Sequence, residues 1–315
     1  MARTMSVTFV IMAGGGGKRL RPLVCAKRPK VCLSLDGTRS LLQATIERLR
    51  LVWPKAHWLI VTTQGQADIV RRHLPGSLRR ALLVEPQIKN TAACLTLAAA
   101  TVAARDPRRV MVVVPADHWV GGAVAYRRSV RAAIRAAVQQ DAIAMIGIRP
   151  THAHTGLGYL CAGAPLRGVN GPRLFRLAAF VEKPSRAVAA RLLKQPRTYW
   201  NNGTFVATAD KFLEALTVWL PDHTQRLVPL ATALQTARGV AHPRLTVRAQ
   251  TAYRGLKPVS FDHGVMDHLQ EGIVVEGLFA WSDVGSVEVW AKLSRGALKD
   301  PQLTRAREGD ARAGS

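Results

Sequence analysis

Fifteen residues near the N-terminus combine bare backbone with fixed positive charge. The segment FVIMAGGGGKRLRPL (9–23) runs from an apolar stretch into four consecutive glycines and then Lys18, Arg19 and Arg21. Glycine has no Cβ, so its backbone N–H can approach phosphate oxygens, and an arginine can hold such oxygens through two parallel hydrogen bonds. The segment indicates a phosphate-binding loop, although a dinucleotide loop or a plain tight turn would explain the glycines alone.

The two common glycine-rich phosphate motifs do not fit this loop. GxxxxGK[ST] fails because Lys18 is followed by Arg19, and GxGxxG fails because the third glycine is absent. Three more cations follow within a dozen residues, at Lys27, Arg28 and Lys30. This second cationic element favours a ligand with several phosphates, such as a nucleoside triphosphate.

Two carboxylates directly follow apolar runs, Asp117 in VVVPADH and Asp283 in LFAWSDVGS. Magnesium in proteins takes one or two carboxylates and completes its shell with substrate phosphates and water. Helix capping would explain either aspartate by itself. Because both occur in a chain with a cationic glycine loop, we favour a Mg²⁺ site.

Histidines carry less information than the carboxylates. The HAH spacing of His152 and His154 places both on one face of a strand with no third ligand in the neighbouring sequence. We expect these two and His118 to be structural or exposed to solvent.

Apolar runs alternate with amphipathic segments through the first half of the chain. Such near-continuous apolar strands separated by helices predict a parallel sheet covered on both faces. Ligands of these sheets bind beyond the carboxyl ends of the strands, so the glycine loop and PADH (115–118) should share one edge. The predicted strands are 7–12, 57–63, 81–85, 110–115 and 142–148, and the predicted helices are 41–51, 66–74, 90–104 and 123–139.

The rhythm changes near Thr151, without a Pro- or Ser-rich linker. Here the pattern predicts strands over 174–182 and 272–280 and a helix over 185–194. We therefore expect one compact unit over 1–295, with a substrate-side subdomain after about residue 150. Apolar periodicity is lost after that, so 296–315 should be a poorly ordered tail.

Composition excludes several classes of protein. The four cysteines lack the spacing of a zinc site or a disulfide framework, and no apolar run is long enough for a signal peptide or a membrane span. The formal net charge is +25, but the basic residues are spread along the chain without aromatic residues between them. We expect a cytoplasmic protein that binds no specific nucleic acid and associates with polyanions only at low salt.

The motifs resemble, in the same order, those of the mannose-1-phosphate guanylyltransferases, a branch of the sugar-1-phosphate nucleotidyltransferases. The resemblance extends from Val7 to Leu293. The matching segments are AGGGGKRLRPL, RPK (28–30), EPQIKNTAACLTLAA (85–99), VPADH (114–118), TGLGY (155–159), FVEKP (180–184), YWNNGTF (199–205), SFDHGVMD (260–267) and WSDVGS (281–286).

The resemblance implies a Rossmann-like, mostly parallel α/β sheet covered by helices, with a smaller mixed β-rich region for the sugar phosphate. It divides the unit into a nucleotide-binding half, about 1–150, and a sugar-phosphate-binding half, about 151–295. It assigns catalysis to Arg19, Lys30, Asp117 and Asp283, of which the two aspartates would hold Mg²⁺. It assigns the nucleotide to Gly14, Gly15, Gly17, Lys18, Arg19, Glu85, Asn90 and Thr91. It assigns the sugar phosphate to Gly158, Glu182, Lys183, Asn201 and Asp262.

The implied reaction joins GTP and α-D-mannose 1-phosphate into GDP-mannose and pyrophosphate, with homo-oligomer formation left open. The region around Glu85 favours guanine, because thymidylyl- and uridylyl-transferring relatives carry other motifs there. Two alternatives remain: another manno-configured sugar such as a heptose, and a non-catalytic paralogue that binds nucleotide or a polyanion. The chain departs from the family pattern at Lys18, Arg21, Asn202 and Val287.

Overall fold

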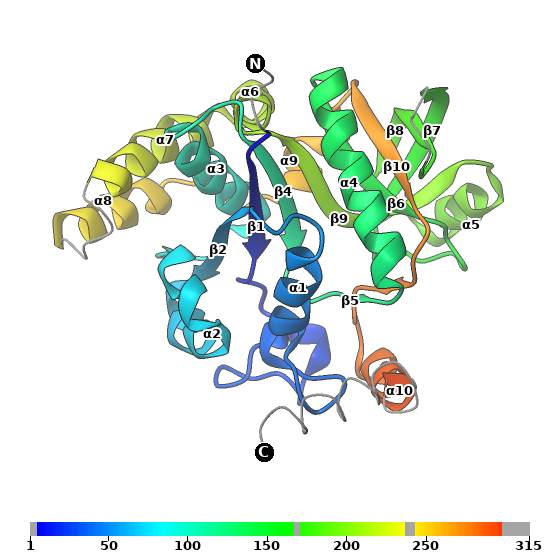
Figure 1. Ribbon diagram of the computed structural model, residues 1–315, viewed down its shortest axis with the longest axis horizontal. Coiled ribbons are helices and arrows are strands. Elements are labelled where there is room, and N and C mark those ends of the chain that lie inside the picture. Colours follow the sequence, from blue (N-terminus) through cyan, green and yellow to red (C-terminus); the bar gives the residue numbers. More distant parts are fainter. Residues whose placement is uncertain (1–4, 167–170, 237–242, 298–315) are drawn as a thin grey trace.

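The computed structural model describes residues 5–166, 171–236 and 243–297, which fold around a single large sheet (Figure 1). Its strand order is β3-β2-β1-β4-β9-β6-β10-β8-β7. The strands are β1 (Val7–Met12), β2 (His57–Thr63), β3 (Leu82–Glu85), β4 (Val110–Pro115), β6 (Ile143–Ile148), β7 (Tyr159–Leu166), β8 (Leu174–Val181), β9 (Thr198–Thr208) and β10 (Gly272–Gly277).

The first four strands run parallel and form one end of the sheet. β9 is antiparallel to both of its neighbours, β4 and β6, while β10 again runs parallel to β6. β8 and β7 close the other end in antiparallel pairings. The predicted fold class, a mostly parallel α/β sheet with a mixed β-rich part, is confirmed.

Side-chain alternation along the strands creates two hydrophobic layers. Phe9 and Ile11 face one layer, which α1 (Leu41–Arg50), α2 (Ala67–His73) and α4 (Ala123–Gln140) cover. Val10 faces the other layer. That layer is covered by α3 (Asn90–Ala103), α6 (Ala209–Trp219) and α9 (Phe261–Gly264).

Further elements surround this core. α7 (Pro221–Thr236) and α8 (Pro243–Arg254) lie outside α3 (Figure 1). Leu227, Leu230 and Tyr253 pack against residues of α3 in a third buried cluster. The remaining helices are α5 (Arg186–Lys194) and α10 (Val287–Ala297). A separate two-stranded ribbon consists of β5 (Trp119–Val120) and β11 (Trp281–Ser282), and short 3-10 turns are Lys18–Leu20, Lys30–Cys32, Gln64–Gln66, Gly76–Ala81 and Met266–His268.

The strands and helices predicted for the first half are present to within about one residue at most of their ends. The sequence pattern does not identify β9, because Asn201, Asn202 and Gly203 interrupt its apolar run and its register with β6 shifts there. β9 and β10, both from the second half, lie inside the same sheet as the first. The division near residue 150 stays a prediction, and of the expected tail, 298–315 lies outside the described residues.

No helix in the described part of the chain is both long and apolar enough to span a membrane.

Candidate active site

The β5–β11 ribbon brings the two predicted metal-binding carboxylates to one place. Trp119 pairs with Ser282 and Val120 with Trp281 in antiparallel register. Asp117 lies just before this ribbon on one strand, and Asp283 lies directly after it on the other. Antiparallel pairing therefore puts both aspartates at the same end of the ribbon, although 166 positions separate them in sequence.

Lys30 joins the two aspartates. Its Nζ lies 2.8 Å from Asp117 Oδ2 and donates a hydrogen bond of 2.5 Å to the backbone oxygen of Asp283. Arg19 Nη2 lies 3.5 Å from Asp283 Oδ2. The structure thus brings together all four residues predicted to be catalytic, with Lys30 almost fully buried and Arg19 exposed.

The electrostatic environment keeps Asp117 charged and His118 neutral. Burial opposes the charged form of Asp117, but the ammonium of Lys30 outweighs it through its charge and its hydrogen bond and lowers the pKa of the carboxyl. Burial lowers the pKa of His118 to about 4, although Asp117 opposes this shift. Trp281 Nε1 donates to His118 Nδ1 at 3.2 Å, which holds the ring beside Asp117.

The donor set suits a hard divalent cation that shares its shell with a ligand. Among the described residues, no group of three or more His, Cys, Asp or Glu side chains is arranged to hold a metal ion. Two carboxylates are nevertheless enough for Mg²⁺ when phosphate oxygens and water complete the shell. The Lys30 ammonium already lies against Asp117 and the Asp283 carbonyl, so the position attracts positive charge.

The glycine loop passes over Lys30, and Gly17 makes this approach feasible. Gly17 has φ +56°, and a Cβ added there would lie 2.9 Å from Lys30 Cβ. Gly14 lies beside Thr63 and Glu85, whereas a Cβ on Gly15 would meet nothing within 4 Å, so the loop is open to a ligand there. The side chain of Lys18 lies outside the described part of the structure.

We expect Gly17→Ala to lower the free energy of unfolding by about 1 to 3 kcal/mol, because the new Cβ adds a left-handed backbone penalty to a clash. Gly16→Ala is the matched control, since a Cβ there meets nothing within 4 Å and its φ is not positive. Urea denaturation of the three proteins measures the difference. Equal stability of the two variants would contradict this account of the loop.

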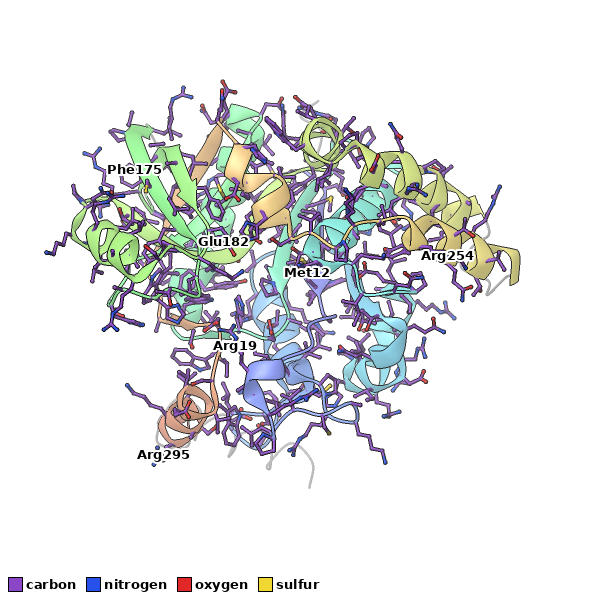
Figure 2. All side chains as sticks on the ribbon, turned by 180° about the vertical axis from the view of Figure 1, so that it is seen from behind. Met12, Arg19, Phe175, Glu182, Arg254 and Arg295 are labelled. Atoms are coloured by element: carbon purple, nitrogen blue, oxygen red, sulfur yellow. The ribbon has the colours of Figure 1, made fainter. Side chains whose placement is uncertain are left out.

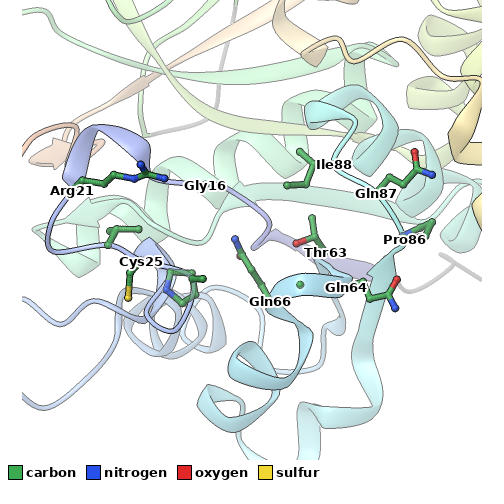
Figure 3. A pocket seen from close by; sticks show the side chains of 13 residues that line it. Gly16, Arg21, Cys25, Thr63, Gln64, Gln66, Pro86, Gln87 and Ile88 are labelled. Atoms are coloured by element: carbon green, nitrogen blue, oxygen red, sulfur yellow. The ribbon is translucent and has the colours of Figure 1, made fainter.

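A cleft of about 460 Å³ adjoins the glycine loop at the carboxyl ends of β1, β2 and β3 (Figure 3). Gln66 lies between the cleft and the loop and donates through Nε2 to the backbone oxygen of Gly15 at 3.3 Å. Sequence reasoning missed the parts of the lining that follow β2 (63–66) and β3 (86–88), although the rule that ligands bind at strand ends points to both of these turns. The lining residues are Gly16, Arg21, Val24, Cys25, Ala26, Pro29, Thr63, Gln64, Gly65, Gln66, Pro86, Gln87 and Ile88.

The three predicted base-binding residues lie beside this cleft rather than in its lining. Glu85 ends β3, is buried, and accepts a hydrogen bond of 3.1 Å from Tyr253 Oη. Burial raises the pKa of Glu85 to about 8, so its carboxyl is mostly protonated at neutral pH. Asn90 begins α3 with φ +66°, and Thr91 Oγ1 accepts from the backbone N–H of Phe261 at 2.9 Å. Their roles in nucleotide binding stay predictions.

The residues predicted to bind the sugar phosphate form a second polar cluster. A Cβ on Gly158 would lie 2.6 Å from Glu182 Oε2, so only glycine lets this carboxylate pack there. Lys183 Nζ lies 2.6 Å from Glu182 Oε1. Asn201 Nδ2 donates to Asp262 Oδ1 at 2.9 Å, and the backbone N–H of Asn201 donates to the Gly158 carbonyl at 2.8 Å.

Burial and a neighbouring carboxylate set the protonation of Asp262 in this second cluster. Burial, with the Glu182 carboxylate adding to it, raises the pKa of Asp262 to about 6. Figure 2 shows Arg19, Glu182 and Met12, the last residue of β1, toward the middle of the molecule in this view. Arg254 and Arg295 lie at its outer edges in the same view, so they are remote from this region.

Comparison with known proteins identifies a family that matches this chain. The family model described as nucleotidyl transferase matches residues 8–299. A mannose-1-phosphate guanylyltransferase of Salmonella muenchen is 34% identical over 93% of this chain and 60% of its own length. The xanthan biosynthesis protein XanB of Xanthomonas campestris is 32% identical over 96% of this chain and 61% of its own. The chain therefore spans about three fifths of the length of these curated relatives.

Two solved structures resemble this chain in fold. A Thermus thermophilus protein described as a mannose-1-phosphate geranyltransferase matches with a TM-score of 0.75 and 32% identity, covering 89% of this chain and 77% of that chain. A Helicobacter pylori protein described as mannose-6-phosphate isomerase has a TM-score of 0.67 at 20% identity, which is a likeness of fold alone.

Proposed function

Because the chain belongs to the nucleotidyl transferase family, we propose that it transfers GMP from GTP to α-D-mannose 1-phosphate. The products are GDP-mannose and pyrophosphate. The observation that carries this proposal is the meeting of Lys30, Asp117 and Asp283 beneath a glycine loop, with Arg19 beside them. The named relatives favour mannose as the sugar and guanine as the base.

The reaction needs no general base from the protein. A phosphate monoester has a second pKa near 6, so its oxygen is already an anionic nucleophile at neutral pH. That oxygen attacks the α-phosphorus of GTP in line, a new P–O bond forms, and the bond to the β-phosphate oxygen breaks to release pyrophosphate. Catalysis then consists of holding two anions together and stabilising the charge on the phosphoryl group and the leaving group.

The residues of the site would divide this work. Arg19 and the open backbone at Gly15 would bind the triphosphate, and Lys30 would lie near the transferred phosphorus. Asp117 and Asp283 would hold Mg²⁺, which supplies positive charge to phosphate oxygens when bound. Lys18 and Arg21 carry two further charges near the triphosphate.

The cleft would receive the base of the nucleotide, and the second cluster would receive the sugar phosphate. The amide side chains of Gln64, Gln66 and Gln87 offer the donors and acceptors that a purine base needs. Glu182 and Asp262 offer carboxylate oxygens for sugar hydroxyls, and Lys183 offers a cation for the sugar phosphate.

We place the activity in the cytoplasm. All four cysteines are free thiols, as is usual in that reducing compartment.

In the presence of Mg²⁺, the purified protein should release pyrophosphate from GTP when mannose 1-phosphate is added. It should release none when mannose 1-phosphate is left out. A coupled pyrophosphate assay with a panel of sugar 1-phosphates and nucleoside triphosphates measures this. If none of the sugar phosphates in the panel leads to pyrophosphate release, the proposal is refuted. Faster release with a heptose 1-phosphate than with mannose 1-phosphate would identify the heptose as the preferred sugar.

A further inference from the structure

The loop between β6 and β7 holds His154 firmly. Tyr159 Oη, which is fully buried, donates to the backbone oxygen of His154 and accepts from its backbone N–H, both at 2.9 Å. The ring Nδ1 accepts from the backbone N–H of Gly156 at 3.0 Å, and the ring packs edge-on near Trp200 and His152. Both the backbone and the ring are thereby fixed.

One N–H donor of this ring has no partner in the part of the chain that the structure describes. A backbone N–H can only donate, so Nδ1 of His154 must be the unprotonated nitrogen and Nε2 carries the hydrogen. Burial lowers the pKa of His154, which keeps the ring neutral at pH 7. Within 5–166, 171–236 and 243–297, Nε2 makes no hydrogen bond, so it presents a donor of fixed direction.

This donor lies beside the proposed triphosphate site. A Cβ added to Gly156 would lie 3.0 Å from His154 Cε1 and 3.6 Å from Arg19 Nη1, so imidazole and guanidinium rest against the same glycine. Arg19 in turn contacts Asp283. A phosphate group bound by Arg19 would therefore come within reach of the His154 ring.

We propose that His154 is a phosphate-binding residue whose Nε2–H donates to an oxygen of the phosphate group that Arg19 binds. The inference rests on the proposed function, because it takes the Arg19 site as the place of the triphosphate and of the pyrophosphate released from it. It reverses the expectation from sequence that His154 is structural or merely exposed. A neutral donor is suited here, since it holds a phosphate oxygen without adding a further full charge.

His152 provides the contrast. It is exposed, and its Nδ1 lies 3.0 Å from Thr151 Oγ1, a neighbour in sequence. Its ring packs edge-on against that of His154, but no hydrogen bond or ion pair joins it to Arg19 or Asp283 in the described structure, so the control also accounts for the lost packing. His152→Asn is therefore the matched control for substitutions at His154.

Two substitutions at His154 separate the roles of its two ring nitrogens. His154→Asn places an amide oxygen near the position of Nδ1, so it keeps the acceptor for Gly156 and removes the distant donor. His154→Gln extends its amide N–H to the region of Nε2 and keeps the donor. A structural role would be preserved by Asn, whereas a phosphate-binding role would be preserved by Gln.

Inorganic pyrophosphate is the direct probe, titrated calorimetrically in the presence of Mg²⁺. We expect His154→Asn to weaken its binding about tenfold or more, because hydrogen bonds to charged groups are among the stronger ones. His154→Gln and His152→Asn should stay within about threefold of the parent protein. The KM for GTP should rise with the same ranking, and the melting temperature should not follow it.

The outcomes decide the inference independently of the proposed function. Equal pyrophosphate affinity of His154→Asn and the parent protein would overturn it, as would an equal loss in His154→Gln, or no pyrophosphate binding by the parent protein. Pyrophosphate binding that follows the predicted ranking in a protein without guanylyl transfer would refute the proposed function and support His154 as a phosphate-binding residue.

Discussion

Asp283→Asn should lower the rate of pyrophosphate release by about a thousandfold or more while leaving the fold nearly as stable as before. The amide removes the negative charge proposed to hold Mg²⁺. Lys30 keeps its hydrogen bond, because it donates to the backbone oxygen of Asp283 and not to the carboxylate. The ion pair that is lost, with Arg19, has an exposed partner and contributes at most about 1 kcal/mol.

Asp117→Asn should lose the same activity and also stability. Lys30 Nζ lies 2.8 Å from Asp117 Oδ2 and is almost fully buried, so this substitution leaves a buried ammonium without its carboxylate. Breaking such a pair costs on the order of 3 kcal/mol. We therefore expect Asp117 to contribute both to catalysis and to the free energy of unfolding, and Asp283 to contribute mainly to catalysis.

Pyrophosphate release and urea denaturation measured on both variants test this pair of expectations. Asp68→Asn is the control, since Asp68 is exposed and its ion pair is with Arg71, one turn away on α2. Turnover by Asp283→Asn at more than a tenth of the parent rate would contradict the metal assignment. Salt-sensitive polyanion binding that survives in all variants, with no turnover in the parent protein, would favour the non-catalytic paralogue.

The sequence predicts the first half of the sheet well because local physics decides it. β1 and β4 are continuous apolar runs between helices, and burial on both faces requires that pattern. The same rule places the glycine loop and Asp117 at one edge. The pairing of β5 with β11, which brings Asp283 to Asp117, depends on contacts between distant segments and is not visible in local periodicity.

Other parts of the site could not be predicted for related reasons. The partner of Asn201 is Asp262, and only the path of β9 through the middle of the sheet brings them together. The strand expected around His152 and His154 is wrong, because this segment is a loop that ends where β7 begins at Tyr159. The anchors of His154, a tyrosine hydroxyl and backbone groups of the turn, are not visible in the alternation of the two histidines. The turn after β2, with Gln64 and Gln66, lacks a motif and follows only from the strand-end rule.

Glu85 gives the second large effect, on the pH dependence of stability. Burial raises the pKa of its carboxyl from 4.5 to about 8, whereas in the unfolded chain it returns to its ordinary value. Between these values the folded protein binds more protons than the unfolded chain, so stability is greatest at the acid end and falls as the pH rises through 8. The shift corresponds to at most about 5 kcal/mol.

Urea denaturation between pH 5 and pH 8.5 should therefore show Glu85→Gln gaining about 2 to 5 kcal/mol relative to the parent protein as the pH rises. Glutamine is the matched substitution, because it keeps an acceptor for Tyr253 Oη and cannot ionise.

The nucleotide site should respond to the same titration of Glu85. Glu85 Oε2 lies 4.0 Å from the position of a Cβ on Gly14, so its ionisation puts a negative charge under the glycine loop. The KM for GTP should accordingly rise above pH 8 in the parent protein and stay flat in Glu85→Gln. Parallel pH profiles for the two proteins would show that this carboxyl ionises as it does in water.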